Sequence, residues 1–62
     1  MNAKQEFLQH LDREIEKYED SAKGWQLLKD HGNYPQESDA QIKRCRDYAN
    51  ELRALKEQAN KA

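Results

Sequence analysis

Apolar residues recur at alternating steps of three and four along the first half of the chain. The series runs Leu8, Leu11, Ile15, Tyr18, Ala22 and Trp25. This spacing places the side chains on one face of an α-helix that packs against another helix at a shallow angle. Phe7 and Leu28 widen the face beyond a narrow seam. The pattern predicts an amphipathic helix over residues 3–31.

Helix-breaking residues lie together near the middle of the chain. The segment 31–35 reads His-Gly-Asn-Tyr-Pro. Gly32 readily adopts the left-handed conformation that ends a helix, and Pro35 cannot continue one. We therefore expect a turn over residues 32–37. A connection this short makes the flanking helices antiparallel neighbours.

A second amphipathic helix is predicted over residues 38–60. Ser38 and Gln41 have the spacing of a capping box, in which each side chain bonds the backbone amide of the other residue. The apolar series that follows is Ile42, Cys45, Ala49 and Leu52, broadened by Tyr48 and Leu55. The chain is thus expected to form one all-α domain over residues 1–62, an antiparallel two-helix hairpin.

The predicted apolar faces are wider than two helices alone can cover. The residues expected in the core are Leu8, Leu11, Ile15, Tyr18, Trp25, Leu28, Ile42, Cys45, Tyr48, Leu52 and Leu55. A lone hairpin would leave about half of this surface in water. It would then forgo a stabilising free energy of about 25 cal/mol for each Å² of apolar surface left exposed. Two hairpins packed face to face into a four-helix bundle would bury it, and a twofold homodimer is the commonest closed assembly. We expect a homodimer, with a higher oligomer or a different protein partner as alternatives.

Composition points to the same need for a partner. A chain of 62 residues usually completes its stability with disulfides, a metal or another subunit, and Cys45 is its only cysteine. The inward position of Cys45 predicts a small buried side chain, with a redox role or a disulfide across the dimer as alternatives. A lone thiol is typical of a reducing compartment, which predicts a cytoplasmic location. His10 and His31 lack the paired spacing of zinc ligands, so no metal site is expected.

Neither membrane insertion nor catalysis is predicted. No apolar run approaches the length of about 18 residues that a membrane span needs, and the first residues lack the order of a signal peptide. The sequence has no glycine-rich phosphate loop and no arrangement of nucleophile and base. A two-helix unit also lacks the cleft that a small-molecule substrate requires. We expect no enzymatic activity and no cofactor.

Charge is distributed unevenly between the two predicted helices. Residues 1–31 hold seven acidic and five basic residues, and residues 38–62 hold six basic and four acidic residues, which gives −2 and +2. Glu37 in the turn brings the whole chain to −1. Opposite charges of this size favour helices that lie side by side, although each exposed pair contributes little.

Two sets of exposed residues are candidates for binding. The acidic set, with one aromatic residue of the turn, is a candidate surface for a protein partner: Asp12, Glu16, Glu19, Asp20 and Tyr34. The alternative is a basic set for nucleic acid: Lys43, Arg44, Arg46 and Arg53. Both sets also fit simpler roles, since the acids suit a solvated face and the bases can pair with acids one turn away. For Tyr34 the sequence favours packing over the end of the hairpin, with anchoring of a partner as the alternative.

A net negative chain is a poor general binder of DNA, which favours the protein partner. The sequence therefore predicts a homodimeric helical module for protein–protein interaction, with a small nucleic-acid-associated regulator as the alternative.

Gly24 interrupts the first predicted helix and lowers its helix propensity by about 1 kcal/mol relative to alanine. Either a neighbour approaches closely at this point, or the large indole of Trp25 is accommodated there, or the glycine is exposed and tolerated.

Three general features link the chain to one group of known proteins. They are the compact frame from Met1 to Ala62, the charged helix with the segment Leu-Gln-His-Leu-Asp-Arg-Glu-Ile at 8–15, and the bare turn at 32–35. In these features the chain resembles the small helical-hairpin proteins encoded in the early regions of lambdoid phages. The resemblance implies a cytoplasmic dimer that alters host physiology or phage development by binding a host protein.

Overall fold

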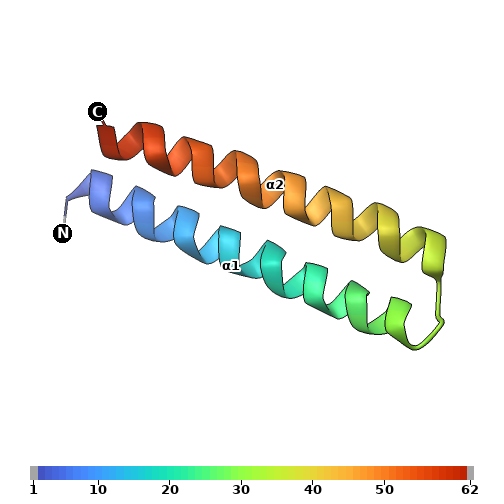
Figure 1. Ribbon diagram of the computed structural model, residues 1–62. Coiled ribbons are helices and arrows are strands. Elements are labelled where there is room, and N and C mark those ends of the chain that lie inside the picture. Colours follow the sequence, from blue (N-terminus) through green and yellow to red (C-terminus); the bar gives the residue numbers. More distant parts are fainter. Residues whose placement is uncertain (1, 62) are drawn as a thin grey trace.

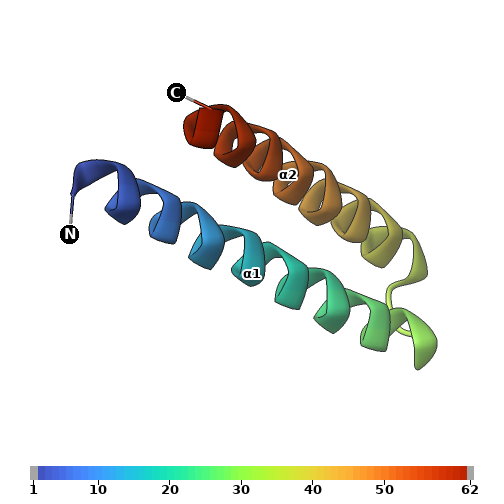
Figure 2. The same ribbon diagram turned by 60° about the vertical axis from the view of Figure 1, so that its left-hand side comes forward.

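A computed structural model describes residues 2–61 as two α-helices joined by a tight turn (Figure 1). Helix α1 spans Ala3–Asp30 and helix α2 spans Pro35–Lys61. They lie side by side and antiparallel, so the start of α1 and the end of α2 share the end opposite the turn (Figures 1 and 2). The Cα atoms extend over 46 × 18 × 11 Å, which describes a flat rod. The predicted all-α hairpin is confirmed.

Neither helix, within residues 2–61, combines the length and the apolar character needed to cross a membrane.

Helix α1 is capped at both ends by its own sequence. Asn2 has an extended backbone, and its side-chain oxygen accepts a hydrogen bond of 2.8 Å from the amide three residues later. At the other end, Gly32 has a φ of 78°. The amide of Gly32 donates to the carbonyl of Lys29, and the amide of Asn33 donates to the carbonyl of Leu28, both at 2.9 Å. This is a Schellman motif, so the predicted role of the glycine is confirmed.

Helix α2 begins at Pro35, three residues earlier than predicted. The carbonyl of Tyr34 accepts the first helical hydrogen bond, of 2.8 Å, from the amide of Ser38. Proline suits the first helical position because no N–H is needed there and its φ is already close to helical. The predicted capping box of Ser38 and Gln41 is therefore wrong. A proline prevents a helix from continuing through it but does not prevent a helix from starting at it.

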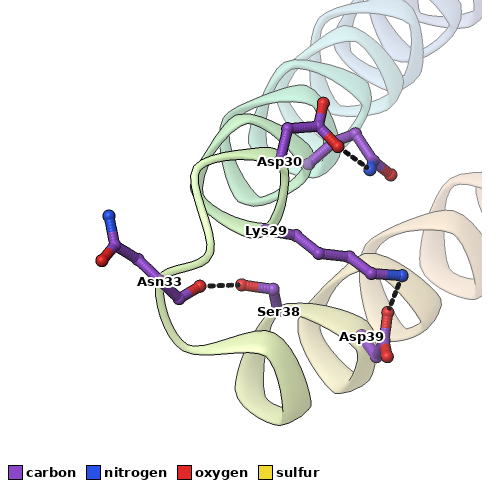
Figure 3. Close-up of polar contacts among 6 residues, drawn as sticks. Lys29, Asp30, Asn33, Ser38 and Asp39 are labelled. Atoms are coloured by element: carbon purple, nitrogen blue, oxygen red, sulfur yellow. Dashed lines mark hydrogen bonds and ion pairs between the residues drawn. The ribbon is translucent and has the colours of Figure 1, made fainter.

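Ser38 instead joins the turn to α2. Its side chain is fully buried, and its hydroxyl donates a long hydrogen bond of 3.5 Å to the carbonyl of Asn33 (Figure 3). Tyr34, between them, has a φ of 47°, a left-handed conformation that is uncommon for a residue with a side chain. Gly32 and Tyr34 together reverse the chain within residues 31–34.

The buried core is one line of small and medium-sized side chains between the helices. Its apolar members are Leu11, Ile15, Ala22, Ile42, Cys45 and Ala49. Among the other residues predicted for the core, the half-buried ones are Leu8, Tyr18, Trp25 and Leu52. The exposed ones are Leu28, Tyr48 and Leu55, with 38%, 48% and 43% of their surface accessible. A single chain thus covers only the middle of each predicted apolar face.

Gly24 lies on the exposed surface of α1. A Cβ atom built at this position would meet no heavy atom within 4 Å, apart from residues 23 and 25 and the backbone of the same helix. No residue of α2 therefore approaches this place within one chain, and Gly24 is exposed in the hairpin.

Candidate interaction surface

The facing residues of the two helices follow alternating steps of three and four, as in an antiparallel coiled coil. On α1 they are Leu8, Leu11, Ile15, Tyr18, Ala22, Trp25 and Lys29. On α2 they are Ser38, Ile42, Cys45, Ala49, Leu52, Lys56 and Ala59. Residues that flank these lines fall on the two broad sides of the rod, and the two sides differ in chemistry.

One broad side carries the ion pairs between the helices, and we call it the charged side. The pairs are Asp12–Lys56 at 2.5 Å, Lys29–Asp39 at 2.6 Å and Glu19–Arg53. Two of them join an acid of α1 to a base of α2, as expected from the negative charge of the first helix and the positive charge of the second. The pair Lys29–Asp39, near the turn, has the reverse polarity (Figure 3). All three pairs are partly exposed, so each contributes about 1 kcal/mol or less.

The opposite broad side carries large apolar residues, and we call it the apolar side. Phe7 and Leu28 directly precede facing positions of α1, and Tyr48 and Leu55 directly precede facing positions of α2. Such positions of two antiparallel helices flank the same side of the pair. All four side chains are exposed, to between 38% and 48%. They form an interrupted apolar stripe along the rod.

Tyr18 and Tyr48 connect the two helices in the middle of the apolar side. Their rings are stacked, with centroids 4.8 Å apart and planes inclined by 18°. An aromatic pair of this kind contributes about 0.5–1.5 kcal/mol beyond the area that it buries. Trp25 lies one heptad beyond Tyr18 on the same helix and is half-buried. The stack leaves 48% of Tyr48 accessible, so one chain buries only part of this aromatic cluster.

The predicted acidic surface is divided by the ion pairs. Asp12 and Glu19 are engaged with bases of α2, so they contribute to the hairpin itself. Glu16 and Asp20 lie one turn apart on the exposed surface of α1, and neither makes an ion pair within residues 2–61. Only these two acids of the predicted set remain free of the other helix.

Tyr34 lies at the turn and is 63% exposed. This exposure does not support packing over the end of the hairpin. Asp20 precedes the last residue of α1 by ten positions, or about 15 Å of helix, so Tyr34 and the free acids do not form one surface.

The predicted basic set does not gather into one surface either. Arg53 is engaged with Glu19 and also donates to the side chain of Asn50 at 2.9 Å. Arg44 and Arg46 are two residues apart on α2, which places them about 200° apart around the helix. They therefore point to different sides of the rod.

Lys43, the remaining basic candidate, pairs with Asp47 one turn along α2, at 2.8 Å. The hydrogen bond to the Asp47 carboxylate, and then its charge, raise the pKa of Lys43 above its ordinary value. Lys43 is thus charged at neutral pH but already has an acidic partner.

An open hollow of about 390 Å³ lies between the helices on the charged side. Its floor is formed by the small residues Ala22, Cys45 and Ala49, and charged or amide side chains surround it. The thiol of Cys45 is free and buried, as expected of a small core residue. Within the described part of the chain, no group of three or more His, Cys, Asp or Glu side chains is placed to hold a metal ion.

Sequence reasoning missed Lys56 as a structural residue. Lys56 occupies a facing position, four residues after Leu52, and reaches Asp12 from there. The step of four was the available signal, but a lysine at that step does not extend an apolar series. Its aliphatic stem can cover the facing line while its charged end pairs with Asp12.

Comparison with protein-family models, with curated protein sequences and with solved structures found no match for this chain.

Proposed function

We propose that the protein is a homodimeric helical module for protein–protein interaction, and that the apolar side is its dimer interface. The observation that carries the proposal is the stripe of exposed large apolar residues along one broad side of the rod: Phe7, Leu28, Tyr48 and Leu55. Large apolar side chains gathered on one side of a small protein mark a candidate association site.

The accessible surface of the single chain supports this proposal. A compact monomer of 7.4 kDa exposes about 4,200 Å² by the usual scaling with mass. The hairpin exposes 4862 Å². The excess is what a flat rod with one layer of helices leaves uncovered, and a second layer would remove it.

The dimensions of the apolar side also fit a stable dimer. The rod has an outline of 46 × 18 Å on its broad sides. Face-to-face packing over this outline would bury roughly 800 Å² per chain, which is the standard size of a specific interface. The product is a four-helix bundle, and the single cysteine of each chain suits a cytoplasmic location.

In such a dimer the charged sides face outward, together with the free acids Glu16 and Asp20. These surfaces are where we propose that another protein binds, in keeping with the resemblance to phage proteins that act on a host protein. The scattering and pairing of the basic residues favour a protein over a nucleic acid as the partner.

Sedimentation equilibrium from low to high micromolar concentration tests the dimer. We expect a mass twice that of the 7.4 kDa chain, and a Trp25 fluorescence that becomes shielded from a soluble quencher as the dimer forms. A stably helical chain that remains at 7.4 kDa at high micromolar concentration would overturn the proposal.

A further inference from the structure

Two charged residues, Lys17 and Glu51, lie on the outer edges (rims) of the apolar side and make no ion pair within residues 2–61. Glu51 lies on α2 between Tyr48 and Leu55, one turn from each. Lys17 lies on α1, three turns before Leu28 and on nearly the same line of the helix. Neither Lys17 nor Glu51 makes an ion pair within the described residues, whereas the charged side is crossed by three pairs. Both are exposed.

Two of the three ion pairs on the charged side indicate the same register, that is, which residues of α1 and α2 are level (at the same height along the rod). The third pair, Glu19–Arg53, is offset from this register by four residues. Asp12 is level with Lys56. Lys17 comes five residues after Asp12, and Glu51 comes five residues before Lys56 on the antiparallel helix. Lys17 and Glu51 are therefore level with each other, on opposite rims of the apolar side.

The same reasoning applies near the turn. Lys29 is level with Asp39, so His31, two residues later, is level with Glu37, two residues earlier. Both are exposed. These two levels thus present a lysine or a histidine on the α1 rim and a glutamate on the α2 rim.

We infer that the second copy packs on the apolar side after rotation about the long axis of the rod, so that α1 lies over the partner's α2. This inference rests on the proposed homodimer and specifies its arrangement. The rotation keeps every residue at the same height along the rod, and it places the α1 rim of each copy against the α2 rim of the other. Lys17 then faces the partner's Glu51, and His31 faces the partner's Glu37, each contact occurring twice because the interface is twofold.

This arrangement also gives Gly24 a neighbour. Gly24 comes twelve residues after Asp12, and Arg44 comes twelve residues before Lys56, so the two are level. The open space above Gly24 would receive the stem of the partner's Arg44. A glycine at this position leaves room for a long side chain between the two layers.

The competing arrangement is a rotation about the short axis of the rod, through the Tyr18–Tyr48 stack. It would place α1 over the partner's α1 and bring Lys17 near the partner's Lys17. On α2 it would bring Glu51 near the partner's Glu51. Like charges brought close together across an interface are destabilising. The charges on the rims therefore favour the rotation about the long axis.

Charge reversal tests the inference. Lys17→Glu and Glu51→Lys should each weaken dimerisation about tenfold, since each creates two like-charge contacts and removes two attractive ones. The double variant should restore most of the affinity. Glu16→Lys, on the outward surface of the same helix, is the matched control and should leave the dissociation constant within about twofold. Circular dichroism at equal dimer occupancy checks that all variants are folded.

Cysteine cross-linking provides a readout that does not depend on small energies. In a Cys45→Ala background, the double variant Lys17→Cys with Glu51→Cys should form disulfide-linked dimers on mild oxidation, and Lys17→Cys alone should not. Cross-linking of Lys17→Cys alone, or loss of rescue in a protein that still dimerises, would overturn the arrangement but leave the dimer standing. A monomeric wild type would overturn both.

Discussion

The ring of Tyr18 lies stacked on the ring of Tyr48, with centroids 4.8 Å apart, and this contact joins the two helices on the side of the hairpin that is rich in exposed apolar residues. The stack fixes the orientation of both rings before any partner arrives. A rigid aromatic surface loses little conformational entropy on binding, so it is well suited to the centre of an interface.

Truncation of this aromatic pair should therefore weaken the dimer. We expect Tyr48→Ala to raise the dimer dissociation constant roughly 10- to 100-fold, because both copies lose a stacked ring and its buried area. Sedimentation velocity over a dilution series measures the change. Tyr34→Ala is the control, since Tyr34 is 63% exposed at the turn. Equal effects of the two variants would place the interface elsewhere.

The two glycines should respond in opposite ways to alanine. Gly32→Ala should lower the free energy of unfolding by about 1 kcal/mol, because Gly32 has a φ of 78° in the helix-ending motif. In the undimerised hairpin, Gly24→Ala should raise it by about 0.5–1 kcal/mol, because Gly24 lies inside a helix with open space around it in one chain. Urea denaturation at a protein concentration below the dimer dissociation constant gives both values. A stabilising Gly32→Ala would contradict the turn geometry.

Burial of Cys45 should slow its chemistry. Only 7% of the residue is accessible, so a water-soluble disulfide reagent should modify the native protein far more slowly than the protein in denaturant. Absorbance of the released thiolate follows the reaction. Modification of native protein as fast as that of unfolded protein would show that the core line between the helices opens readily.

Duplex DNA should not retain the protein even at low salt. Arg53 and Lys43 already have acidic partners, Arg44 and Arg46 point to different sides, and the chain has a net charge of −1. Heparin or DNA affinity chromatography between about 50 and 200 mM salt is the measurement. Retention that falls with rising salt would revive the nucleic-acid alternative.

The two helices and their antiparallel order were predictable from sequence because apolar spacing and the breakers around Gly32 report local geometry. The residue at which α2 starts was not predictable from sequence. Serine followed by glutamine three residues later matches a capping box wherever it occurs, and only the three-dimensional path of the turn shows that Pro35 precedes it as the first helical residue. Local motifs compete, and the structure shows which of them prevails.

The candidate surface was less predictable for a related reason. Asp12 and Glu19 read as exposed acids in the sequence, and their engagement with Lys56 and Arg53 depends on the register between the helices. The register sets which of the charged residues are free, and sequence spacing within one helix carries no information about it. The division into a charged and an apolar side follows from that register.

The start of α1 and the end of α2 lie together opposite the turn, which has a practical consequence for labelling (Figure 1). A rotation about the long axis would leave both turns at one end of the dimer and bring these helix ends of both copies together at the other. Fluorophores attached at the end of α2 in two copies would then exchange energy efficiently. With the other rotation they would sit at opposite tips of a rod 46 Å long, and a fluorophore pair whose Förster distance is well below 46 Å would transfer energy weakly.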